Sequence, residues 1–283
     1  MVKNYSLNIS DGEKLQISTF QICDSKFDKV LIFVHGFKGF KDWGFGPYIG
    51  NYFSEKGYFV ITFNFSHNGI GENPLEFTEL EKFSKNTFSR EIRELNELIN
   101  AVRNGFFENL SIEAQIGLCG HSRGGAISIL TAAKRNDIFA VAVWASISKL
   151  DRYSKRQKEE WSKKGFFEVI NMRTKQIMKL DVALLDDIEN NSEDLLNIEK
   201  AVKNLNKPLF IAHGDQDLAV SIEEAEQIYE WSDKSKTEFL KIIGTGHTFN
   251  IVHPFAGTNH KFEKVLEGTL NFFNNNLAEK KWN

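Results

Sequence analysis

The stretch of sequence that decides the fold reads Gly117, Leu118, Cys119, Gly120, His121, Ser122, Arg123, Gly124 and Gly125. It ends an apolar run over residues 112–119, which predicts a buried strand, and it precedes residues 126–135, which predict a helix. A serine on a sharp turn from strand to helix needs a strained backbone, and it needs no side-chain bulk two positions before or after. Gly120 and Gly124 meet that need, so we predict that Ser122 is a nucleophile.

A serine nucleophile needs a base and an acid, and the chain supplies candidates in the order serine, acid, histidine. Asp217 follows an apolar strand predicted over residues 207–214, and His247 follows a strand predicted over residues 238–243. The histidine would take the proton from Ser122, while the carboxylate would hold the imidazole in the required tautomer. We therefore expect these three catalytic residues on loops at one end of a sheet.

An oxyanion hole is the fourth element that this chemistry requires, and it is built from backbone N–H groups. A strand predicted over residues 30–34 runs into the loop 35–40, which begins His35-Gly36-Phe37. We expect the N–H of Phe37 and the N–H of Arg123 to be the two donors. His35 is expected to brace the loop and to take no part in the reaction.

Strands and helices alternate along the remaining sequence, which predicts an α/β fold with a mostly parallel central sheet and helices on both faces. The chain opens with an antiparallel hairpin predicted over residues 5–10 and 14–22, turning at Asp11-Gly12. Further strands are predicted over residues 58–65, 114–119 and 140–147. Amphipathic helices are predicted over residues 88–104 and 260–276.

One segment departs from this alternation, because about 60 residues separate the strands that end near Ile147 and begin at Pro208, roughly twice what a crossover helix needs. We predict a core made of residues 1–147 and 207–283, with residues 148–206 inserted as a small cap over Ser122. Trp161 and Phe166 in the insertion are candidate substrate contacts, as are Phe40 and Trp43 near the oxyanion loop. Packing is the alternative role for all four aromatic side chains.

Taken together, these motifs resemble α/β-hydrolase-fold serine hydrolases over nearly the whole chain. The segments 35–43 and 64–69 resemble small bacterial carboxylesterases, including the cinnamoyl and feruloyl esterase group. The resemblance implies ester hydrolysis through an acyl-enzyme on Ser122, with Asp217 and His247 in their usual roles. The chain departs from many relatives after the acid, where residues 218–221 contain no proline.

Other residues compete for two of these roles. Asp215 is the alternative acid, and the position three residues after His213-Gly214 favours Asp217 in this fold. His253 and His260 are the alternative bases, whereas His247 has the position expected in the loop after the last strand.

Composition excludes several other classes. Lys and Arg number 35 against 38 Asp and Glu, so the net charge is −3 and no basic field is present to recruit nucleic acid. The first twelve residues lack an apolar core of signal-peptide length, and no stretch approaches the ~20 apolar residues that span a bilayer, so we expect a cytoplasmic protein with no membrane partner. Only Cys23 and Cys119 occur, and no zinc spacing or phosphate loop is found, so we expect no metal and no cofactor.

The sequence therefore predicts a serine carboxylesterase acting on a small-molecule ester with an aromatic or otherwise hydrophobic acyl group. A thioesterase, a peptidase or amidase, and an acyltransferase would use the same machinery. A ligand-binding protein on the same scaffold is the alternative from another class. The sequence leaves the natural substrate and the oligomeric state open.

Overall fold

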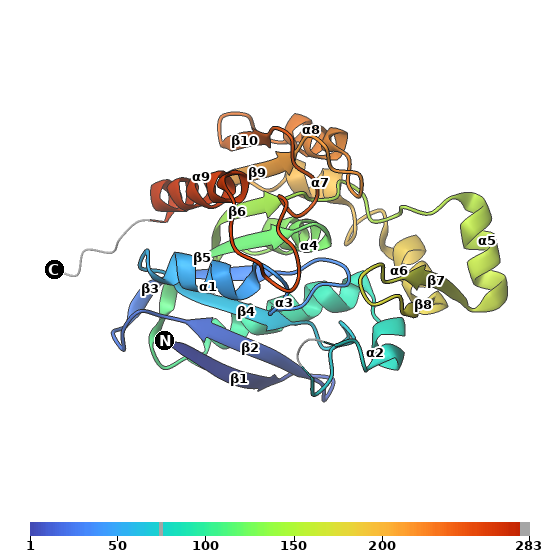
Figure 1. Ribbon diagram of the computed structural model, residues 1–283, viewed down its shortest axis with the longest axis horizontal. Coiled ribbons are helices and arrows are strands. Elements are labelled where there is room, and N and C mark those ends of the chain that lie inside the picture. The colour runs from blue at the N-terminus through green and yellow to red at the C-terminus, as the bar shows by residue number, and fades with distance from the viewer. Residues whose placement is uncertain (74–75, 278–283) are drawn as a thin grey trace.

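An eight-stranded, mostly parallel sheet forms the centre of the molecule, in a computed structural model that describes residues 1–73 and 76–277 (Figure 1). The strand order is β1-β2-β4-β3-β5-β6-β9-β10, and β2 runs antiparallel to both of its neighbours. The strands are β1 Val2–Asn8, β2 Lys14–Phe20, β3 Phe27–Val34, β4 Phe59–Asn64, β5 Leu110–His121, β6 Ile138–Trp144, β9 Leu209–Gly214 and β10 Thr237–Ile242. The predicted mostly parallel central sheet is confirmed.

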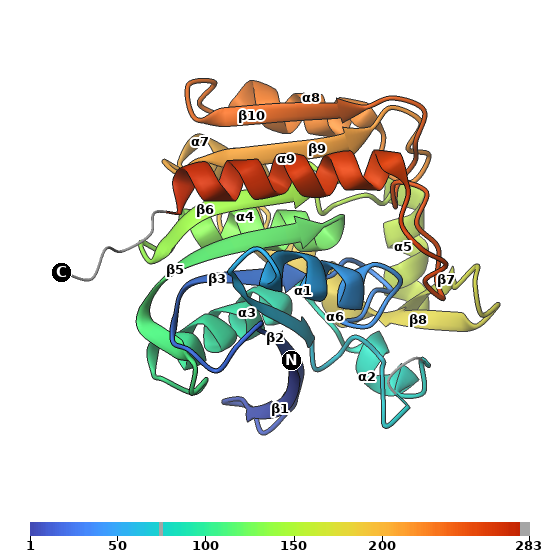
Figure 2. The ribbon, with the colours of Figure 1, turned by 60° about the vertical axis from the view of Figure 1, so that its left-hand side comes forward.

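Helices cover both faces of the sheet, and two apolar clusters fill the spaces between (Figure 2). One face carries α1 Gly46–Ser54 and α9 His260–Asn276, and the other carries α3 Phe88–Arg103, α4 Arg123–Ala133 and α8 Ile222–Trp231. The predicted helix over residues 88–104 matches α3, whose apolar positions recur at helical spacing and are buried against the sheet. Predicted strands 14–22 and 140–147 end earlier, at Phe20 and Trp144.

The segment predicted to be an insertion, residues 148–206, contains a two-stranded hairpin and three helices, and it is called the insertion below. Its elements are α5 Lys155–Lys164, β7 Phe166–Ile170, β8 Ile177–Asp181, α6 Val182–Asn191 and α7 Ile198–Lys203. Figure 1 shows α5, β7, β8 and α6 projecting to one side of the sheet, close to the short helix α2 Leu80–Ser84. The last helix, α7, returns to the body and packs on α4 and α8.

Contacts from several core elements fix the hairpin of the insertion. The Lys38 Nζ donates to the carbonyl oxygen of Ile170 at 2.9 Å, and the Gln176 Nε2 donates to that of Phe77 at 2.9 Å. On α6, the Asp187 carboxylate accepts from the Ser89 N–H at 3.0 Å. The hairpin is therefore tied to the loop after β3 and to the segment between β4 and α3.

Candidate active site

Ser122 lies at the turn between β5 and α4 with φ 57° and ψ −121°, a backbone conformation that costs energy in any residue with a side chain. The close approach of strand and helix explains the flanking glycines. A Cβ at Gly120 would lie 2.2 Å from the Gly124 carbonyl oxygen, and a Cβ at Gly124 would lie 2.1 Å from the Val34 carbonyl oxygen. The Ser122 N–H donates to the carbonyl oxygen of Trp144 at 2.8 Å, which holds the turn against β6.

The structure brings Ser122, His247 and Asp217 together, although they are far apart in the sequence. The Ser122 Oγ lies 3.0 Å from the His247 Nε2, and the His247 Nδ1 lies 2.7 Å from the Asp217 Oδ2. With Nδ1 donating to the carboxylate, Nε2 presents its lone pair to the serine hydroxyl. This arrangement can remove a proton from Ser122.

The competing residues lie elsewhere. The Asp215 Oδ1 accepts from the Gly244 N–H at 2.6 Å, which closes the turn after β10. The His253 Nδ1 accepts from the Gly44 N–H at 2.9 Å, and His260 is exposed at the start of α9. None of the three makes a hydrogen bond to Ser122 or His247 in the described part of the chain.

Asp217 is buried and held by its own loop. Its Oδ1 accepts from the N–H groups of Ala219 and Val220 at 2.8 and 2.9 Å, so the segment without proline still closes around the carboxylate. Burial favours the protonated form, but hydrogen bonds with His213 and His247 outweigh it and hold the pKa of Asp217 well below its usual range. The carboxylate is therefore ionised and stabilises positive charge on His247.

His121, the residue before the serine, contacts His247 directly. Its Nε2 donates to the His247 carbonyl oxygen at 2.8 Å, and the two ring centroids are 4.8 Å apart. Burial, and then the charge of His247, lower the pKa of His121 to about 3. The ring is therefore neutral, and it fixes the backbone of His247. Its position next to Ser122 was the only signal of this role in the sequence.

The loop after β3 lies against the serine turn. A Cβ at Gly36 would lie 2.9 Å from the Ser122 Cβ and 3.5 Å from the Arg123 nitrogen. Within residues 1–73 and 76–277, neither the Phe37 N–H nor the Arg123 N–H donates to another residue. Both donors are thus available to an oxygen bound beside Ser122.

The expected brace, His35, connects this loop to β4. Its Nδ1 donates to the Gly36 carbonyl oxygen at 3.0 Å, and its Nε2 accepts from the Phe65 N–H at 3.3 Å. Burial is the main cause that lowers the pKa of His35 to about 4, and the charge of Arg123 acts in the same direction. Only the neutral ring can make both hydrogen bonds.

The Arg123 side chain is also buried, and it packs on the loop after β3. Its guanidinium carbon lies 4.2 Å from the ring centroid of Phe37 and 4.7 Å from that of Phe88, and an ion pair at 3.3 Å joins it to Glu91 on α3. This stacking orients Phe37, whose N–H is a candidate donor.

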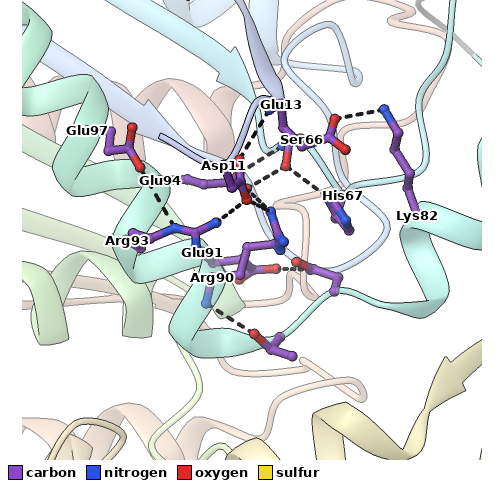
Figure 3. Close-up of polar contacts among 12 residues, drawn as sticks. Asp11, Glu13, Ser66, His67, Lys82, Arg90, Glu91, Arg93, Glu94 and Glu97 are labelled. Atoms are coloured by element: carbon purple, nitrogen blue, oxygen red, sulfur yellow. Dashed lines mark hydrogen bonds and ion pairs between the residues drawn. The ribbon is translucent and has the colours of Figure 1, made fainter. Parts of the chain in front are cut away.

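A polar network joins α3, the helix that carries Glu91, to the first hairpin and to the loop after β4 (Figure 3). Arg90 and Arg93 both pair with Asp11 in the first hairpin, at 2.6 and 2.5 Å. The buried Glu94 accepts from the N–H of Ser66 at 2.8 Å, in the loop after β4. The network therefore holds the helix that carries Glu91, the partner of Arg123.

Two cavities meet at Ser122. The larger, of about 530 Å³, is lined on the apolar side by Phe37, Phe40, Trp43, Phe45, Met172 and Val252. The second, of about 420 Å³, is lined among others by Phe88, Ile147, Leu150, Arg152 and Tyr153. Of the four aromatic residues expected to contact substrate, Phe40 and Trp43 line the larger cavity.

Trp161 and Phe166 line neither cavity. Trp161 is fully buried and packs against the rings of Tyr153 and Phe167, with centroids 4.9 and 5.5 Å apart. The Phe166 ring lies under the Lys179 ammonium at 4.0 Å. In this structure the packing alternative applies to both, and the insertion instead reaches the larger cavity through Asn171, Met172 and Arg173.

The sheet order and the serine at the turn after β5 define the class of protein, an α/β hydrolase. The chain belongs to the prolyl oligopeptidase family, whose model matches residues 51–280, and it is therefore a serine hydrolase. No protein among the curated sequences is similar enough to count as a match. None of the helices in the described residues is long and apolar enough to cross a membrane.

Solved structures share this fold at low sequence identity. The esterase domain of a Rhodothermus marinus protein is 16% identical with a TM-score of 0.68, covering 98% of this chain and all of that domain. Est1E of Butyrivibrio proteoclasticus with bound ferulic acid is 19% identical with a TM-score of 0.70, over 96% and 99% of the two chains. The α/β hydrolase GrgF of Penicillium sp. sh18 is 16% identical with a TM-score of 0.74, over 99% and 100%. The expected resemblance to α/β-hydrolase esterases is confirmed.

Proposed function

We propose that this protein hydrolyses carboxylic esters of small molecules through an acyl-enzyme on Ser122. The observation that carries the proposal is the hydrogen-bonded series from the Ser122 Oγ through His247 to the ionised Asp217. The similarity to esterases, including one with ferulic acid bound, supports an ester substrate.

In the first half of the reaction, the Ser122 Oγ attacks the ester carbonyl while His247 Nε2 takes its proton. The negative charge that develops on the carbonyl oxygen is stabilised by the N–H groups of Phe37 and Arg123. His247 then gives the proton to the departing alkoxide. In the second half, His247 activates a water molecule, which releases the acid and restores the Ser122 hydroxyl.

Covalent labelling tests the proposal. A fluorophosphonate probe should label the wild-type protein with one equivalent, and Ser122→Ala should abolish both labelling and turnover of 4-nitrophenyl butyrate, with a loss on the order of 10³-fold or more. Ser162→Ala is the matched control, because that serine is exposed on α5. If Ser122→Ala kept turnover within tenfold of the wild type, the proposal would fail. Absence of labelling would favour a binding protein.

Hydrolysis of a peptide or amide bond is the second candidate, and the match to the prolyl oligopeptidase family favours it. An amide needs the same acyl-enzyme but a poorer leaving group, so the acid role of His247 matters more. A panel of esters, thioesters and peptide anilides that share one acyl group would separate the two. A kcat/KM for anilides equal to or above that for the matched esters would favour a peptidase.

We further propose that the insertion acts as a cap that selects substrates. Its hairpin contributes Met172 and Arg173 to the wall of the larger cavity, whereas Ser122, His247 and Asp217 all belong to the core. Changes in the hairpin should thus alter which ester is accepted while leaving the reacting groups in place.

A further inference from the structure

The two cavities at Ser122 carry positive charge only. Their linings include four basic side chains and no Asp or Glu: Lys38, Arg123, Arg152 and Arg173. The chain as a whole has a net charge of −3, so this is a local feature and no consequence of a basic protein. A cavity lined by one sign of charge concentrates ligands of the opposite sign.

Two of the four cations are already neutralised. Arg123 pairs with Glu91 at 3.3 Å, and Arg152 pairs with both carboxylate oxygens of Glu224 at 2.6 and 2.7 Å. Lys38 and Arg173 form no ion pair with any residue in the described ranges 1–73 and 76–277. The unpaired charge is therefore confined to these two side chains.

Both the backbone conformation of Lys38 and the burial of its ammonium group are energetically unfavourable. Its backbone has φ 56°, a region that non-glycine residues rarely adopt, and its side chain lines both cavities. Burial, and then the charge of Arg123, lower the pKa of Lys38. One donor of its ammonium is used by the Ile170 carbonyl oxygen at 2.9 Å, so other donors remain for a ligand.

Arg173 and Asn171 extend this donor group from the β7–β8 hairpin. The Asn171 side chain is buried, and its Oδ1 accepts from the N–H groups of Arg173 and Thr174 at 3.1 and 3.4 Å. The amide NH₂ of Asn171 is consequently the part left to donate, and Asn171 lines the larger cavity with Arg173 and Lys38. The hydrogen bond from Lys38 to the Ile170 carbonyl oxygen holds Lys38 next to the hairpin that carries Asn171 and Arg173.

We propose that Lys38, Asn171 and Arg173 form a subsite for a carboxylate, so that the preferred substrate is an ester bearing a second, ionised acid group. The inference rests on the proposed ester hydrolysis at Ser122. The larger cavity would then hold the apolar linker of the substrate against Phe40, Trp43 and Met172, with its carboxylate at the hairpin. Charge-assisted hydrogen bonds to such a group are about twice as strong as neutral ones.

The test compares pairs of esters that are matched in size and differ in charge. On the acyl side the pair is 4-nitrophenyl hemiadipate and 4-nitrophenyl adipamate, and on the alcohol side it is 4-carboxyphenyl butyrate and 4-carbamoylphenyl butyrate. The measured quantity is the ratio of kcat/KM for the acid over that for the amide, after subtraction of the rate without enzyme. We expect a ratio on the order of tenfold or more for one of the two pairs in the wild-type protein. Ratios near one for both pairs would overturn the subsite, while turnover of the amides would still support esterase activity.

Variants then locate the effect. Lys38→Gln and Arg173→Gln should each lower the favoured ratio severalfold, and Lys38→Arg should restore most of it because it returns the charge. Lys175→Gln is the matched control, since this exposed lysine is on the same hairpin turn, has a positive φ like Lys38 and lines neither cavity. If Lys38→Gln reduced both esters of a pair equally, Lys38 would act on the reacting carbonyl or on folding, and the subsite would be rejected. An unchanged ratio in Arg173→Gln would reject it as well.

Discussion

The buried neutral His35 makes the stability of this protein depend on pH in a way that one substitution can isolate. The pKa of His35 is about 4 in the folded protein against 6.5 for an ordinary histidine, because burial disfavours the charged ring. Between these values the unfolded chain binds more protons than the folded protein, so the free energy of unfolding falls as pH falls. The stabilisation is present in full above pH 6.5 and is lost as pH decreases towards 4.

The magnitude follows from the two pKa values. Each unit of difference corresponds to about 1.4 kcal/mol, so His35 alone should remove about 2 to 3 kcal/mol between pH 7 and pH 4.5. His35→Asn keeps a donor near the position of Nδ1, loses the acceptor for the Phe65 N–H and cannot titrate in this range. The variant should be less stable than the wild type at pH 7 by about 1 kcal/mol or more. Its disadvantage should shrink or reverse by pH 4.5.

Urea unfolding at several pH values measures both curves. His260→Asn is the matched control, because His260 is exposed at the start of α9, and its curve should run parallel to that of the wild type. A constant difference between His35→Asn and the wild type from pH 7 to pH 4.5 would refute the reasoning. It would mean that His35 takes up a proton as easily in the folded protein as in the unfolded chain.

Three further predictions follow from the contacts at the site. Asp217→Asn should lower kcat for 4-nitrophenyl butyrate by roughly 10²-fold to 10⁴-fold, whereas Asp215→Asn should cost little activity; the reverse ranking would reassign the acid. Gly124→Ala should destabilise the fold by about 1 to 3 kcal/mol or more, seen as a lower Tm, because the new Cβ meets backbone atoms on β3; an unchanged Tm would contradict that contact. Trp161→Ala should lower the free energy of unfolding by about 3 to 5 kcal/mol and leave the relative kcat/KM of short and bulky esters unchanged. Met172→Ala should change that relative kcat/KM. A changed ester preference in Trp161→Ala, with none in Met172→Ala, would place the indole at the substrate.

Much of the site could be predicted from local sequence, because its chemistry imposes local constraints. A serine at φ 57° between a strand and a helix requires glycines at 120 and 124, since backbone oxygens lie 2.2 and 2.1 Å from where their Cβ atoms would be. Asp217 and His247 lie in the loops that follow β9 and β10, and parallel strands bring such loops to the same edge of the sheet. The order of strands and loops in the sequence therefore predicts that Ser122 and His247 lie close together, although 125 residues separate them.

Phe40 and Trp43 line the larger cavity as expected, but the cavity residues of the insertion could not be predicted, because their placement depends on contacts between distant segments. Trp161 and Met172 are both large apolar side chains in the insertion, yet one is fully buried inside it and the other is exposed to the cavity. The hairpin β7–β8 was not predicted, and its strands are short and bounded by a turn without glycine or proline. No periodicity in the sequence separates these alternatives.

The position of Lys38 depends both on local sequence and on a contact between distant segments. It follows Phe37 in the loop that the sequence identifies with the oxyanion hole, but its significance depends on Ile170, which lies 132 residues away. The groups that we propose for ester hydrolysis lie in loops near the ends of core strands, whereas the groups that we propose to bind the rest of the substrate come from the contact of that core with the insertion. Substitutions in the hairpin can therefore change the charge of the cavity without moving Ser122, His247 or Asp217. Substrate preference can therefore diverge through residues such as Arg173 while the reaction proposed at Ser122 stays the same.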